Sequence, residues 1–101
     1  MTLQTPGPLS KSTAGAPIAI GTGATAVHDS GSARVDDVVL ALVNVTSSAV
    51  DATVAIAGGT GLVVTVPAKS QVAVGPFAVR GAVTVLAGSA SAIYAIGSIR
   101  R

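Results

Sequence analysis

The sequence predicts an all-β fold: a small β-sandwich or jelly-roll-like domain with an extended N-terminal arm. Val, Ile and Thr supply 32 of the 101 residues, and Glu is absent. Such β-branched side chains favour strands over helices. Short alternating segments are also separated by glycine, proline and serine, and no segment has sustained helical periodicity. We expect residues 1–25 to form the arm and residues 26–101 the sandwich.

The arm is rich in glycine, serine and threonine and contains three prolines, which disfavour a helix. Only residues 18–20 predict a short strand there. We expect the arm to reach a neighbouring molecule and to contribute binding rather than fold. Its candidate anchors are its large aliphatic side chains, Leu3, Leu9, Ile18 and Ile20. A disordered tail is the alternative interpretation.

The rest of the chain alternates between short strand patterns and turns. Strands are expected at 26–28, 38–46, 51–56, 62–66, 71–74, 77–79, 82–87 and 92–96. Both faces of the segment 38–46 are largely apolar, so we expect it to be buried on both sides or covered by a partner. The turns at 67–70 and 88–91 each predict a hairpin between the strands that flank them.

Composition limits the core that this domain can build. The chain has one Phe, one Tyr and no Trp, and aromatic side chains bury the largest areas. A domain of about 100 residues is already limited in the surface it buries. We therefore expect a homo-oligomer, with a trimer favoured.

Charge and hydropathy exclude several partners. The net charge is +2, and the basic residues are scattered, so we expect no nucleic-acid binding. Residues 81–99 are uncharged over 19 residues, which is long enough to span a membrane. A Gly-Ser-Ala-Ser turn interrupts them, and alternation on either side predicts strands, so we expect no membrane span. The first residues lack the basic and apolar regions of a signal peptide.

The chain shows no pattern that predicts catalysis. His28, Asp29 and Ser30 are the residue types of a hydrolytic triad, but neighbours on one loop rarely converge in space, so we interpret them as a surface turn. Asp36 and Asp37 point to opposite faces of a strand and are expected to begin the long strand. With no cysteine and one histidine, we expect no metal site, no cofactor and no enzymatic activity.

Two further motifs have simpler interpretations. The segment 58–61, Gly-Gly-Thr-Gly, lacks the Gly-Lys-Ser/Thr ending and the following helix of a phosphate-binding loop, so we expect a turn. Asn44, Val45 and Thr46 form a glycosylation sequon. Without a secretion signal, we interpret this match as accidental.

The order of these features carries a family resemblance. Val27-His28 precedes a long apolar strand that ends in "VNVTSS", followed by "ATVAIAGG". Next come "VTVPAKSQVAVGPFAV" and the C-terminal "GAVTVLAGSASAIYAIGSIRR". Over residues 26–101 this order resembles small virion structural proteins of tailed bacteriophages. It departs from them in having Leu, Ala and Thr where those chains often carry Trp or Tyr.

The resemblance implies a non-enzymatic capsid decoration or cement protein that binds the phage head surface and stabilises the shell. Its partner would be the major capsid protein or another virion protein. It would be made in the host cytoplasm and reside on the capsid surface of the virion. A tail or baseplate component is the alternative within the same virion. A receptor- or carbohydrate-binding β-sandwich is the alternative from another class, although sugar platforms usually need more aromatic faces.

Overall fold

A computed structural model describes residues 6–13, 15–31, 35–57, 59 and 61–100. The described residues form only strands, turns and irregular segments. The strands, in chain order, are β1 (Pro6–Pro8), β2 (Ile18–Ile20), β3 (Thr25–Asp29), β4 (Asp36–Asn44), β5 (Val50–Ile56), β6 (Leu62–Val66), β7 (Gln71–Val79), β8 (Ala82–Ala87) and β9 (Ile93–Arg100). The all-β prediction is therefore confirmed.

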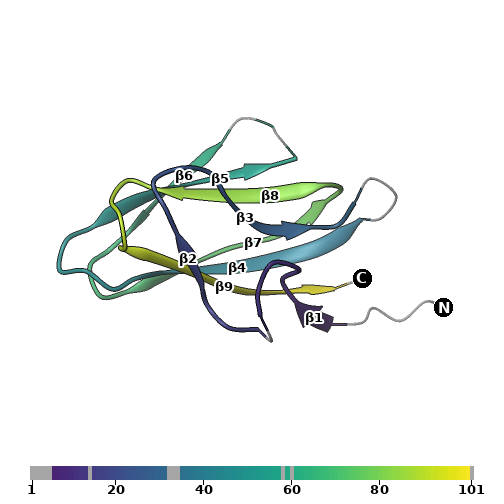
Figure 1. Ribbon diagram of the computed structural model, residues 1–101, viewed down its shortest axis with the longest axis horizontal. Helices are drawn as coiled ribbons and strands as arrows, with labels where there is room; N and C mark the ends of the chain where they lie inside the picture. The colour runs from purple at the N-terminus through teal and green to yellow at the C-terminus, as the bar shows by residue number, and fades with distance from the viewer. Residues whose placement is uncertain (1–5, 14, 32–34, 58, 60, 101) are drawn as a thin grey trace.

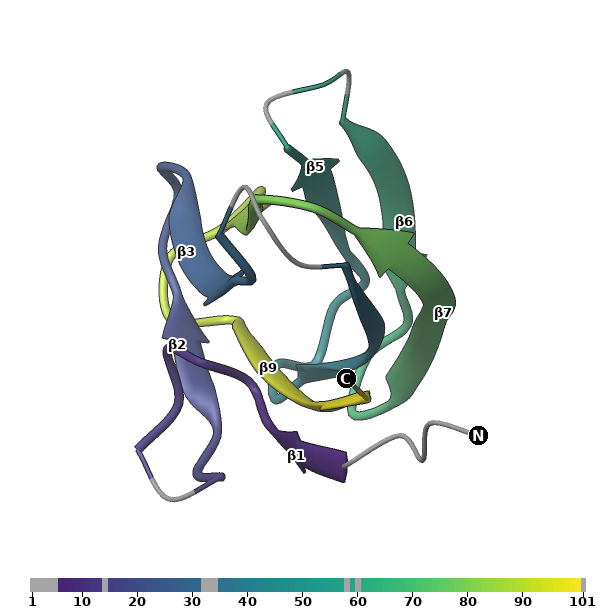
Figure 2. The same cartoon turned by 90° about the vertical axis from the view of Figure 1, so that its right-hand side faces the viewer.

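The strands form two antiparallel sheets that face each other (Figure 1). Sheet A has the order β1-β9-β4-β7, with β2 also paired to β9, and sheet B has the order β3-β8-β5-β6. The pairs β2–β9, β3–β8, β4–β7 and β5–β6 are nested one inside the next. Nested pairs divided between two antiparallel layers are the topology of a jelly roll, and Figure 2 shows the layers wrapped around one interior.

The two hairpins predicted at 67–70 and 88–91 are wrong. Both turns exist, but β6 and β8 lie in sheet B whereas β7 and β9 lie in sheet A. Each turn therefore carries the chain from one sheet to the other. A turn signal marks where a chain reverses, but the hydrogen-bonded neighbour is decided by packing of the whole domain. In the described part of the chain, β5–β6 is the one pair of consecutive strands that are hydrogen-bonded neighbours.

Residues 71–79 form one strand, where the sequence predicts two separated by Gly75-Pro76. The register between β4 and β7 shifts at Val38 to Leu40, opposite this dipeptide. Gly75 has a φ of 102°, and a Cβ there would lie 2.7 Å from the carbonyl oxygen of Val38. Glycine therefore lets the strand pass through an irregularity that another residue would obstruct.

The core lies between the sheets, and valine is its most frequent residue. Side chains alternate between the two faces of each strand, so every second residue of β4 is buried in the core while its neighbours are not. The largest fully buried apolar side chains are Leu9, Ile20, Val27, Val38, Leu40, Leu42, Val54, Val66, Val79, Ile93 and Ile99. Leucine and isoleucine from the N-terminal segment thus supplement the small valines of the sandwich.

The prediction that residues 1–25 form an arm separate from the fold is wrong for the described part of that segment. β1 and β2 both pair with β9, and β3 begins at Thr25. Leu9 and Ile20 are 1% and 2% exposed in the core of their own chain. Ile18 packs against that core, and Leu3 lies outside the described residues. Apolar side chains close to an open edge of their own sheet can be buried there without a neighbour.

Candidate functional site

The outer face of sheet A is apolar at its centre. The register places Ala41 opposite Ile96, and Val43 opposite Tyr94. These side chains and Val39 point away from the core, because their neighbours in each strand are buried inward. Val39 and Ile96 are each 38% exposed. We call these five residues the outer face of sheet A.

The outer face of sheet A is hollowed at one end. Pro17, Val43, Val45, Tyr94 and Ile96 line an open hollow of about 370 Å³. Four of these side chains are aliphatic or cyclic hydrocarbon, and none is charged. A hollow of this chemistry accepts an apolar side chain of another protein, and it offers few groups that would orient a polar small molecule.

Charged residues lie at the two ends of this face. At one end Asp37 of β4 and Arg100 of β9 are partners in the register. At the other end the ammonium group of Lys69 donates a hydrogen bond to the carbonyl oxygen of Val45, at 2.9 Å. An apolar centre with polar margins is the usual anatomy of a protein–protein contact surface.

The sequence partly predicts this surface. It shows that both faces of β4 are apolar, and Val39, Ala41 and Val43 form the face that stays open. It gives no sign that Tyr94 and Ile96 complete the surface, because the pairing of β4 with β9 joins segments about fifty residues apart. The alternation in β9 is the only local signal that its side chains divide between the core and the outside.

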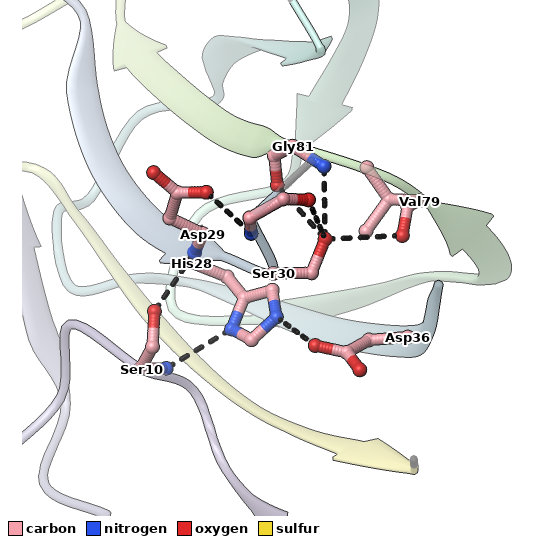
Figure 3. A network of polar contacts seen from close by, with 8 residues as sticks. Ser10, His28, Asp29, Ser30, Asp36, Val79 and Gly81 are labelled. Atoms are coloured by element: carbon pink, nitrogen blue, oxygen red, sulfur yellow. Dashed lines mark hydrogen bonds and ion pairs between the residues drawn. The ribbon is translucent and has the colours of Figure 1, made fainter. Parts of the chain in front are cut away.

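His28 belongs to a cluster of polar residues inside the fold, separate from the outer face of sheet A (Figure 3). The backbone N–H of Ser10 donates to its Nδ1 atom at 3.0 Å, and its Nε2 atom lies 2.8 Å from a carboxylate oxygen of Asp36. Because Nδ1 accepts a hydrogen bond, the proton is on Nε2, which donates to Asp36. Both side chains are fully buried. The pair therefore links the N-terminal segment, β3 and the start of β4.

The interpretation of His28, Asp29 and Ser30 as a surface turn is wrong. His28 and Asp29 belong to β3, and Ser30 is only 6% exposed. The Ser30 hydroxyl accepts a hydrogen bond from the N–H of Gly81 and lies 3.2 Å from the carbonyl oxygen of Val79. The serine and histidine thus face different partners in a closed interior. This geometry has the contacts of a structural cluster.

Asp36 and Asp37 begin β4, as predicted. Their side chains divide as the strand requires: Asp36 is buried and Asp37 is half-buried. A carboxylate oxygen of Asp36 lies in contact with the imidazole of His28. The sequence did not predict this contact, because His28 and Asp36 lie on different strands. A buried carboxylate does require a hydrogen-bond donor nearby, but the sequence does not identify the donor.

Asn44 has a structural role. Its amide nitrogen donates to the carbonyl oxygens of Ser48 and Val66, at 2.8 and 3.0 Å. Its amide oxygen accepts from the N–H and the hydroxyl of Thr46. With both donors engaged and the side chain 1% exposed, Asn44 closes the turn between the sheets. The folded chain does not present it to a glycosylating enzyme.

Comparison with known proteins identified no protein related to this chain. No protein-family model, curated protein or solved structure matches this chain significantly. Within the part of the chain that the structure describes, no three His, Cys, Asp or Glu side chains gather as metal ligands. The same residues include no helix long and apolar enough to cross a membrane. The apolar residues and the hollow described above make the outer face of sheet A the candidate site.

Proposed function

We propose that this chain is a non-enzymatic structural protein of a phage virion, a capsid decoration protein that binds the head and stabilises the shell. The observation that carries the proposal is the outer face of sheet A, an uncharged surface with an apolar hollow. In a free monomer such a surface faces water, whereas a shell protein packed on it would cover the apolar groups.

Two further arguments support the proposal. The jelly roll occurs in viral capsid proteins, although lectins and cupins share it, so the fold is an analogy and not proof of a function. The resemblance of residues 26–101 to small phage virion proteins points to the same class. A tail or baseplate position would use the same surface, so it is an outcome that the experiment must separate.

The test is binding of purified protein to particles that lack it. Ile96→Asp places a charge in the middle of the outer face of sheet A, at a side chain that is already 38% exposed. Burying an unpaired charge in the contact should cost about 2 kcal/mol or more, which is about a 30-fold loss of affinity. The readout is the amount of protein that co-sediments with isolated heads and, separately, with isolated tails.

Ala26→Asp is the matched control, because Ala26 is an exposed apolar residue on sheet B. We expect this variant to bind heads as the unchanged chain does. Equal binding of the Ile96→Asp and Ala26→Asp variants would contradict the proposed surface. Binding to tails alone would contradict the decoration role and favour the tail alternative.

A further inference from the structure

The two sheets end in edge strands, and a free edge offers unpaired backbone N–H and C=O groups to any extended chain. Sheet A ends at β1 and β2 on one side and at β7 on the other, and sheet B ends at β3 and β6. Proteins usually protect such edges with short strands, prolines, bulges or covering loops. The four margins of this molecule differ in that protection.

Three margins carry these devices. β1 and β2 have three residues each, and β1 begins and ends with proline. β7 has the Gly75-Pro76 irregularity in its middle. β3 has a register shift, and the segment before β2 covers it: the N–H of Lys11 donates to the carbonyl oxygen of Val27. These edges resist the addition of another strand.

Within the described residues, the β6 edge shows none of them. Its five residues, Leu62–Val66, include no charge, proline or glycine, and its register with β5 is continuous. The amide of Asn44 holds the end of the strand through the carbonyl oxygen of Val66. β6 is therefore a regular apolar edge at the margin of sheet B, beside β5 (Figure 2).

The side chains of β6 also indicate a missing neighbour. Leu62 is the register partner of Val54 and lies on the same, core-facing side of sheet B. Val54 is 1% exposed, whereas Leu62 is 56% exposed. On the opposite side, Val63 is 60% exposed. One more strand beyond β6 would cover Leu62 in the way that β6 and β8 cover Val54.

We propose that this strand is β6 of a second copy, antiparallel to the first about a two-fold axis. Pairing centred on Val64 aligns Leu62 with Val66 of the second copy, and Val63 with Thr65. This register keeps the core-facing side chains of both copies on one side, as the period of two requires. The two four-stranded sheets then form one continuous sheet across the dimer.

The character of the edge favours a second copy over a foreign peptide. β6 has no charged side chain that would select a different partner or repel its own copy. Four of its five residues are aliphatic and the fifth is Thr65, so an antiparallel copy presents mostly aliphatic side chains to it. Since β6 is the one unprotected edge among the described residues, a two-fold contact closes at two copies and leaves no such edge for a filament. The structure thus predicts a dimer in place of the trimer that the sequence favours. This dimer is independent of the proposed function, because it uses sheet B whereas the proposed capsid contact uses sheet A.

A matched pair of double variants tests the register. In Val63→Lys/Thr65→Lys, each lysine faces a lysine of the second copy. In Val63→Glu/Thr65→Lys, each glutamate faces a lysine. Both positions are exposed. The Thr65 hydroxyl contacts Asp51, so both variants carry the same Thr65→Lys substitution and place a lysine beside that carboxylate. Like charges opposite each other destabilise a strand pair and opposite charges stabilise it, so the dimer dissociation constants should differ by about tenfold or more.

The measurement is sedimentation of the full chain over a range of concentrations. We expect the unchanged chain and the glutamate-lysine variant to be dimers, and the double-lysine variant to be largely monomeric with an unchanged circular dichroism spectrum. A monomeric or trimeric unchanged chain would overturn the proposal, as would equal dissociation constants for the two variants.

A disulfide provides a measurement that does not depend on charged variants. The chain has no cysteine, so Val64→Cys can form only an intermolecular disulfide. Directly opposed residues of antiparallel strands have Cα atoms about 4.5–5.5 Å apart, which suits a disulfide. Mild oxidation should link the Val64→Cys chains into dimers and leave Val45→Cys chains, with an exposed cysteine on sheet A, mostly unlinked. Equal linking of both variants would contradict the β6 contact.

Discussion

Replacement of Leu9 by alanine separates a folded N-terminal segment from a binding arm. Leu9 is 1% exposed and lies in the core with Ile20. Leu→Ala at a buried site removes the transfer free energy of the lost groups and leaves a cavity, and together these cost about 2–5 kcal/mol. For a domain of this size, each kcal/mol lowers the Tm by about 4–8 °C. We therefore expect a fall in Tm of at least about 8 °C.

The assay is thermal and urea unfolding of the isolated chain, followed by circular dichroism. Lys11→Ala is the control, because Lys11 is an exposed residue of the same segment and its loss should change the free energy of unfolding by no more than about 0.5 kcal/mol. If the segment were a free arm, both variants would unfold like the unchanged chain. That equality would refute the assignment of Leu9 to the core.

Substitutions of two further residues test the interior. Asp36→Ala leaves the buried Nε2–H of His28 without its acceptor and should lower the free energy of unfolding by about 1–3 kcal/mol. Asp36→Asn keeps an acceptor oxygen and should lower it less, so equal losses of stability in urea unfolding would contradict the hydrogen bond. Gly97→Ala places a Cβ against the carbonyl oxygen of Val39 and should cost about 1–3 kcal/mol by overpacking. Gly23→Ala meets no atom within 4 Å and serves as its control, so similar unfolding midpoints for these two variants would contradict the close approach of β4 and β9.

Local pattern is sufficient to predict most strands of this fold. Alternation and turn residues locate Ile18–Ile20, Leu62–Val66 and Ala82–Ala87 with the bounds that the structure has. These segments are short, β-branched and bounded by glycine, proline or serine, so the local signal and the final structure agree. β1 was not predicted, because a Pro-Gly-Pro segment carries no strand propensity of its own and pairs only because β9 offers an edge.

Pairing between distant strands is what the sequence could not provide. The hairpins expected at 67–70 and 88–91 fail for this reason, and so does the assignment of Leu9 and Ile20 to a neighbour. The contact of His28 with Asp36, the hollow beside Tyr94 and the open edge at β6 all depend on which strands lie side by side. A jelly roll brings the two ends of the chain together on one sheet, so its contacts are mostly non-local.

The same limit applies to the candidate site. The sequence shows that β4 is apolar on both faces and that one face needs a cover. It could not identify which face is the core, since aliphatic side chains occupy both. Burial of Val38, Leu40 and Leu42 answers that question and leaves Val39, Ala41 and Val43 on the outer face of sheet A.

The most direct test of the proposed function is a density map of the intact particle at a resolution that shows strands. The proposal predicts this jelly roll on the head, with the outer face of sheet A against the shell protein and an apolar side chain of that protein in the hollow beside Tyr94. Copies found only on the tail would contradict the proposal, as would copies on the head whose outer face of sheet A points to solvent.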